Sequence, residues 1–195
     1  MRNNNDSEPK APRGAKRFEE KFEKLRLAYK SAEDDKIDDL LADLAKLLRS
    51  SQPLCSYFLL NCDDDRMRFA ILALDEVAEE FCNVEFLATL KQAQRRFPLR
   101  DLTSAMDAVA YAVAEEAFKK DSKREKTLTD RVKATAKLKI HAEDGDPEAQ
   151  YLLALRYYFG SVGGPNYAEA RKWADIAIEN GCVAAEIVRD LPREG

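Results

Sequence analysis

Apolar residues recur along most of this chain at the three- and four-residue spacing of an α-helix. The cleanest stripe consists of Ile37, Leu40, Leu41, Leu44, Leu47 and Leu48. Residues three or four apart lie on one face of a helix, so such a stripe predicts a helix that buries that face. No segment alternates apolar and polar residues over four to eight positions, as an exposed strand does. The pattern therefore predicts an all-α fold.

Similar stripes mark the other expected helices. They run from Phe18 to Tyr29, Met67 to Phe81, Phe86 to Phe97 and Leu102 to Val113, and the last of these helices is expected to continue to about Lys120. Leu54 to Leu60 is apolar except for Ser56, which predicts one or two buried turns. Asp63, Asp64 and Asp65 stand where a helix N-terminus favours negative charge, and capping explains them better than a cation site. The charged run Lys119 to Lys126 is expected to be a loop.

Three regions follow from this pattern. Residues 1–14 contain Asn, Pro and few apolar groups, so we expect a disordered tail. Residues 15–98 are expected to form an N-terminal helical bundle or solenoid-like region. Residues 99–195 are expected to form a helical repeat region, in which 146–181 is the clearest repeat.

The repeat shows as self-similarity at an offset of 36 residues. Gly145 and Gly181 are one such pair. The same offset relates Ala134 to Ala170, Ile140 to Ile176 and Ala149 to Ala185. A helix-turn-helix unit of this length cannot bury its apolar face alone, so neighbouring units stack.

The unit that starts at Asp146 has a start or stop signal at each helix end. Asp146 can cap a first helix that runs from Pro147 to about Phe159, and Gly160 lies in the turn that follows it. Asn166 can cap a second helix that ends at Gly181 in the left-handed conformation. The inner stripe of the second helix is expected to be Ala170, Trp173, Ala174 and Ala177.

This stretch resembles the SEL-one-like repeat family, which is related to the tetratricopeptide repeats. The residues that carry the resemblance are Ala149, Gln150, Leu153, Tyr157, Gly160, Tyr167, Ala170, Trp173, Ala177 and Gly181. Ala154 and Val162 stand where the family usually has Gly, and Asn166 replaces a usual Asp. The resemblance implies a short α/α solenoid. Residues 129–145 look like the second helix of a preceding, degenerate repeat, whose first helix, Ala108 to Phe118, fits only with an inserted loop.

Repeats of this family bind partners on a concave face that first helices line. The resemblance therefore implies that Tyr151, Leu155 and Tyr158 point outward and bind a partner, with Arg156 beside them. Exposed tyrosines beside an arginine are typical anchors of protein interfaces. An alternative stays open, in which Tyr151 or Tyr158 packs against the N-terminal helical region.

Charge is distributed in blocks along a chain whose formal net charge is −4. Residues 31–85 hold five Lys or Arg against fourteen Asp or Glu, and residues 119–139 hold nine against three. The basic segment 119–139 is a second candidate site, for an acidic protein or for phosphate backbones. It contains no aromatic residue, so base stacking is not expected. The acidic helix around Asp34 to Asp43 is an equally good intramolecular partner for it.

The sequence offers no catalytic, cofactor or metal site. It has a single histidine, His141, and none of the common nucleotide, hydrolase or metalloprotease motifs. Cys55, Cys62, Cys82 and Cys182 form no C-x-x-C pair, which disfavours zinc. A reducing compartment is the simplest expectation.

The function that these observations favour is protein binding rather than catalysis. We expect an adaptor or an inhibitory binding protein, such as a bacterial or phage immunity protein, effector or assembly factor. The alternative is a nucleic-acid-associated protein that uses 119–139. No signal peptide and no membrane span is expected, so the expected location is the cytoplasm, with export by a signal-free route left open.

Overall fold

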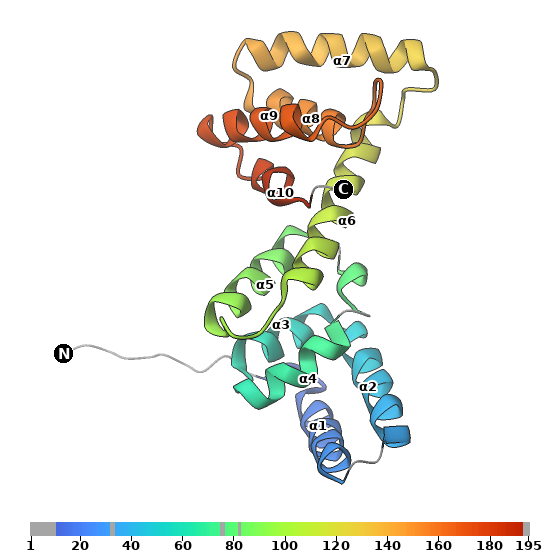
Figure 1. Cartoon of the computed structure of the whole chain (residues 1–195), viewed down its shortest axis with the longest axis vertical. Coiled ribbons are helices and arrows are strands. Elements are labelled where there is room, and N and C mark those ends of the chain that lie inside the picture. Colours follow the sequence, from blue (N-terminus) through green and yellow to red (C-terminus); the bar gives the residue numbers. More distant parts are fainter. Residues whose placement is uncertain (1–10, 32–33, 75–76, 82, 193–195) are drawn as a thin grey trace, which may run out of the picture. The chain divides into compact units, whose positions relative to one another are not determined.

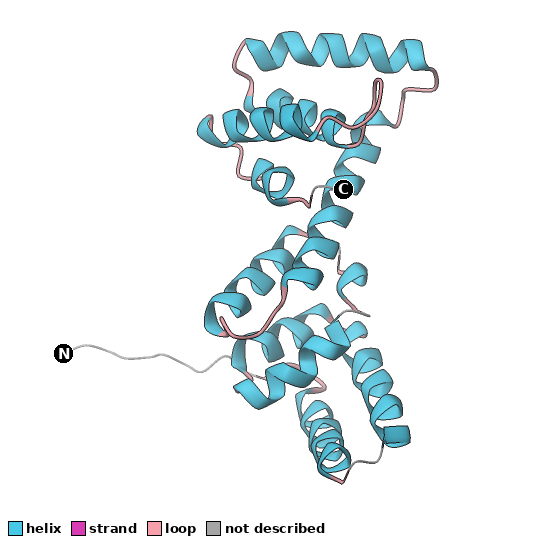
Figure 2. Ribbon diagram, in the orientation of Figure 1, coloured by secondary structure: helices cyan, strands magenta, loops and turns pink. Residues whose placement is uncertain are grey.

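The computed structural model describes residues 11–31, 34–74, 77–81 and 83–192. Within these ranges the regular elements are ten α-helices and one short 3₁₀ helix, with no strand (Figure 2). The all-α prediction is confirmed. Most of the expected tail, residues 1–10, lies outside the described residues, as does Cys82.

The chain divides into two compact units, with the boundary between Met106 and Asp107. We call residues up to Met106 unit 1 and residues from Asp107 onward unit 2. The boundary expected from the sequence, between residues 98 and 99, falls inside unit 1.

Unit 1 is a bundle of short helices (Figure 1). Its elements are α1 (Ala15–Lys30), α2 (Asp34–Arg49), α3 (Gln52–Asn61), α4 (Asp64–Leu74), η1 (Ala78–Glu80) and α5 (Val84–Arg96). Helix α2 packs against α1, α3 and α4, and α3 packs against α5. Phe18 of α1 stacks on Phe58 of α3 in the core. Asp63 caps α4 as expected, because its Oδ1 accepts a 2.9 Å hydrogen bond from the Arg66 amide.

The apolar stripe from Met67 to Phe81 does not form one helix. Helix α4 ends at Leu74, and a separate 3₁₀ turn follows at Ala78–Glu80. Val77 and Ala78 are nevertheless fully buried. The apolar spacing therefore identified core residues correctly but did not indicate that they belong to two separate helical elements.

Unit 2 is built mainly from a stack of helices. Its elements are α6 (Thr103–Ser122, whose first residues belong to unit 1), α7 (Leu128–Glu143), α8 (Pro147–Tyr158), α9 (Tyr167–Glu179) and α10 (Ala185–Asp190). Helices α7, α8 and α9 lie side by side in chain order (Figure 1), and α10 packs against both α9 and α8. Helix α8 is therefore the central helix of the stack.

Helix α6 ends close to the expected position. The apolar stripe that starts at Leu102 predicted a helix to about Lys120 and a loop over Lys119 to Lys126, and α6 continues to Ser122. Lys119 forms a 2.8 Å ion pair with Glu115 one turn earlier, and the Ser122 hydroxyl donates to the Phe118 carbonyl. These local interactions extend the helix past its last buried residues.

The 36-residue offset is present in the backbone as well as in the sequence. At the end of α7 the amides of residues 144, 145 and 146 donate to the carbonyls of residues 140, 142 and 141. At the end of α9 the amides of residues 180, 181 and 182 donate to the carbonyls of residues 176, 178 and 177. Gly145 and Gly181 have nearly equal φ values of 94° and 95°. The two helix ends therefore have the same geometry at positions 36 residues apart.

The α8–α9 hairpin forms as its start and stop signals predict. Asp146 accepts hydrogen bonds from two amides at the start of α8, and Asn166 accepts one from the Glu169 amide at the start of α9. The predicted inner stripe of α9 is buried: Ala170, Trp173, Ala174 and Ala177. These small residues permit close helix packing, and Trp173 fills the remaining space.

Candidate functional site

The residues expected to bind a partner on α8 are mostly inaccessible. Leu155, Arg156 and Tyr158 are 1%, 4% and 5% exposed, and Tyr151 is half-buried. The expectation that Leu155 and Tyr158 point outward is therefore wrong in this structure, and Arg156, which was expected to lie beside them, is buried as well. The physical reason is the position of α8, which has α7, α9 and α10 packed around it.

The two tyrosines have structural surroundings within unit 2. The Tyr158 hydroxyl donates a 2.9 Å hydrogen bond to the Pro192 carbonyl, and its ring meets those of Phe159 and Tyr167 edge-on. Burial, helped by nearby Cys182, raises the pKa of Tyr151 to about 12. Both side chains therefore help to hold the helices together.

Arg156 is the centre of a buried ionic cluster, which we call the Arg156 cluster. It comprises Arg156 of α8, Asp121 of α6, Glu125 of the following loop and Thr135 of α7. Arg156 Nε and Nη2 lie 2.9 and 2.6 Å from Asp121 Oδ2. Nη1 lies 3.1 Å from Glu125 Oε2 and 3.0 Å from the Thr135 hydroxyl, and Nη2 also binds Glu125 Oε1.

These contacts engage all five N–H groups of the guanidinium. Burial lowers the pKa of Arg156, but the hydrogen bonds and charges of Glu125 and Asp121 outweigh it, so the pKa is raised overall. Arg156 therefore has no donor left for a partner. Its role in this structure is to tie the α6–α7 connection to α8.

An open pocket of about 310 Å³ lies beside the Arg156 cluster. Four of its lining residues come from α7: Ala134, Lys137, Leu138 and His141. The other three are Asp121, Glu125 and Arg156. We call the four α7 residues the open face of α7.

The 36-residue offset relates this open face to a buried one on α9. Adding 36 to the residue numbers of the open face gives the inner stripe of α9, which is Ala170, Trp173, Ala174 and Ala177. In α9 that stripe is buried and packs against α8. Among the described helices of unit 2, α6 does not pack extensively against α7, although its Asp121 lines the same pocket. The open face of α7 is therefore less covered than its counterpart on α9.

Helix α6, which the sequence suggested for this position, makes other contacts. Phe118 stacks on Phe159 at the end of α8, and Tyr111 meets the same ring edge-on. Of the residues in α7, Ala142 alone is buried. In the sequence, the 36-residue offset relates Ala134 to Ala170. Applying the same offset to Lys137, Leu138 and His141 predicts this face.

The charge around the open face is positive and largely uncompensated. All three acidic residues of segment 119–139 are engaged: Asp121 and Glu125 bind Arg156, and Asp130 caps α7 with Thr127. Two of its basic residues, Lys119 and Lys139, pair with Glu115 and Glu143. Among the described residues no ion pair is formed by Lys120, Lys123, Arg124, Lys126, Arg131, Lys133 or Lys137.

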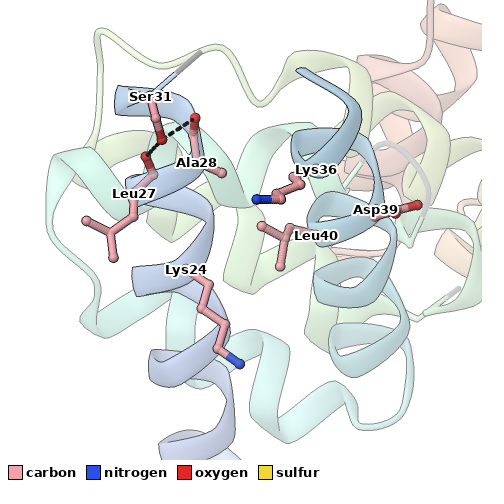
Figure 3. A pocket seen from close by; sticks show the side chains of 7 residues that line it. All are labelled: Lys24, Leu27, Ala28, Ser31, Lys36, Asp39 and Leu40. Atoms are coloured by element: carbon pink, nitrogen blue, oxygen red, sulfur yellow. Dashed lines mark hydrogen bonds between the residues drawn. The ribbon is translucent and has the colours of Figure 1, made fainter. Parts of the chain in front are cut away.

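Unit 1 has a pocket of its own, of about 470 Å³, between α1 and α2. Lys24 and Leu27 of α1 line it together with Lys36 and Leu40 of α2, and Figure 3 shows Lys36 and Leu40 directed toward α1. The Ser31 hydroxyl bonds the Leu27 and Ala28 carbonyls, so it is engaged within the helix end. This is an exposed apolar groove without a buried polar group directed into it.

Two cysteines of unit 1, Cys55 and Cys62, are buried. Burial raises the pKa of Cys55 to about 12 and that of Cys62 to about 11, which keeps both thiols protonated near neutral pH. No group of three or more His, Cys, Asp or Glu in the described ranges is arranged to hold a metal ion. Among the described helices, none combines the length and apolar character that a membrane span requires.

No protein-family model, curated protein or solved structure matches this chain. The open face of α7, the charge beside it and the internal repeat are therefore the observations that bear on function.

Proposed function

We propose that this protein is a binding protein or adaptor that captures another protein on unit 2. The observation that carries the proposal is the open face of α7. Its counterpart on α9 is covered by a helix, whereas Lys137 and His141 are exposed. A repeat protein that leaves such a position uncovered has a surface suited to a guest polypeptide.

The proposal keeps the SEL-one-like repeat interpretation but moves the binding surface. The resemblance implied a face on α8, and the burial of Leu155 and Arg156 makes that face unsuitable. The repeat geometry at Gly145 and Gly181 supports stacked helical units of one kind. Within that arrangement α7 is the first helix of the stack, and its free side is the natural place for capture.

Nucleic-acid binding is the second candidate, and the unpaired cations of segment 119–139 favour it. It ranks lower because the open face also contains Ala134 and Leu138, which offer nothing to a phosphate backbone. A base-stacking aromatic residue is absent from the segment.

Site-specific photocrosslinking in the source cells tests the proposal. A benzophenone amino acid replaces His141, an exposed residue of the open face, which leaves Lys137 in place, and the matched control carries it at Lys172, an exposed lysine of α9. We expect a protein adduct from position 141 and not from position 172. Equal adducts at both positions, or none at 141, would contradict the proposal. If nuclease treatment removes the adduct, the crosslinked partner is a nucleic acid, which would favour the second candidate function.

A further inference from the structure

We infer that the open face of α7 receives an acidic α-helix of the partner protein, in the position that α8 takes against α9. This inference rests on the proposed function and specifies the partner's chemistry.

The shape of the site indicates a helix as the guest. Ala134, Lys137, Leu138 and His141 recur at i, i+3, i+4 and i+7, so they form one ridge along α7. The same ridge on α9 packs against a helix, α8. Ala134 is small, as is Ala170 at the equivalent position, which allows a helix backbone to approach closely. A guest helix therefore repeats an arrangement that this chain already contains.

The residues that differ between the two ridges indicate the charge of the guest. Lys137 stands where α9 has Trp173, and His141 stands where α9 has Ala177. A guest helix that offered only apolar groups to this ridge would desolvate the Lys137 ammonium without a partner. A carboxylate on the guest provides that partner, while Leu138 provides apolar contact.

The charge of segment 119–139, which surrounds the open face, also favours an acidic guest. Segment 119–139 holds nine basic residues against three acidic ones, and Arg156 and Thr127 engage the acidic side chains in hydrogen bonds. The net positive charge of the segment therefore attracts an acidic guest. Exposed cations at the rim, such as Lys133 and Arg131, favour fast and correctly oriented association. Charge complementarity therefore selects an acidic helix over a basic or neutral one.

Selection from a helix library tests this inference and does not require the partner protein itself. The library displays amphipathic segments of about 14 residues, roughly four helical turns, with one apolar stripe and random polar positions. The full chain is the bait, and the variant Lys137→Glu is the counter-selection bait. We expect the selected helices to be enriched in Asp and Glu beside the apolar stripe.

Affinity measurements on the selected helices complete the test. We expect binding to fall about tenfold or more with Lys137→Glu and with added salt, and to be unchanged with Lys172→Glu on α9. The inference would be overturned if the selected helices were neutral or basic, or if both variants lost affinity equally. The inference would also be overturned if the chain associated with itself through this face and Lys137→Glu made it monomeric. The same holds if only RNA or anionic vesicles bind this face.

The two proposals fail in different ways. If position 141 gives a protein adduct but the selected helices are not acidic, protein capture stands and the acidic helix is ruled out. If position 141 gives no adduct, protein capture itself is ruled out.

Discussion

Asn180 donates a 2.9 Å hydrogen bond from its side-chain amide to Oε1 of Gln150, across 30 residues of chain. The Nε2 group of the same glutamine donates, also at 2.9 Å, to the Ala142 carbonyl at the end of α7. Gln150 is 2% exposed and lies in the first turns of α8. One buried amide of the central helix therefore binds the C-terminal ends of both neighbouring helices.

Replacing this glutamine should destabilise unit 2. In Gln150→Ala the Ala142 carbonyl and the Asn180 amide lose a buried partner, which should lower the free energy of unfolding by about 1–3 kcal/mol. Urea denaturation followed by the fluorescence of Trp173, the chain's one tryptophan, reports on unit 2. A double-mutant cycle with Asn180→Ala isolates the pair, and strictly additive losses would show that the two amides do not interact.

The Arg156 cluster should be the most sensitive polar site of unit 2. Arg156→Met leaves Asp121 and Glu125 partly buried without their cation, and breaking such a cluster costs about 3–5 kcal/mol. Arg156→Lys should recover only part of this loss, because an ammonium cannot reproduce the bidentate contacts. Trp173 fluorescence in urea again provides the measurement.

The control for this prediction is Arg189→Met on α10. Arg189 pairs with Asp190 at the surface, and both side chains are 42% exposed. Exposed pairs contribute little, so we expect a change within about 0.5 kcal/mol. Equal losses at Arg156 and Arg189 would show that burial of the cluster does not govern its contribution.

The turn between α8 and α9 makes a prediction about two glycines. Gly160 and Gly163 both have positive φ, 67° and 91°. A Cβ at Gly160 would lie 2.6 Å from the backbone nitrogen of Pro165, whereas nothing lies within 4 Å of one at Gly163. Both alanine variants carry the left-handed strain of about 1–2 kcal/mol, but Gly160→Ala adds a backbone clash.

Gly160→Ala should therefore be destabilised by at least about 1 kcal/mol more than Gly163→Ala. Thermal or urea denaturation of the two variants beside the unchanged chain measures the difference. Indistinguishable midpoints would mean that the turn relaxes around the new methyl group.

The sequence predicted local features of unit 2 well because their causes are local. Asp146 and Asn166 cap amides two or three residues away, and Gly181 ends a helix that it adjoins. These interactions depend on short sequence separations that are visible along the chain. The helix boundaries of the hairpin followed from them.

The partner-binding residues were harder to predict because burial depends on distant parts of the chain. The sequence places Arg156 on an exposed flank, yet its carboxylate partners lie 35 and 31 residues earlier, in a run expected to be a loop. Hydrophobic periodicity contains no information about such a pairing. The open face of α7 could be predicted from the sequence, since it follows from extending the 36-residue offset to Lys137 and His141.

The buried thiols of unit 1 predict both a reactivity order and a pH dependence. Burial raises the pKa of Cys55 from an ordinary value of 9.0 to about 12, so almost no thiolate exists at pH 8. In the folded protein iodoacetamide should therefore label Cys182, which is only partly buried, well before Cys55. Mass spectrometry of the labelled peptides distinguishes the cysteines.

The same shift should make the folded state less stable in alkali. As the pH rises above about 9, an unfolded chain loses the Cys55 proton while the folded chain retains it, so the free energy of unfolding decreases. The slope from one such thiol is at most about 1.4 kcal/mol per pH unit. Cys55→Ala removes this group, so it should lose less stability between about pH 9 and 11 than the unchanged protein. Parallel pH profiles for the two chains, or Cys55 labelled as fast as Cys182, would show that the thiol is accessible in solution.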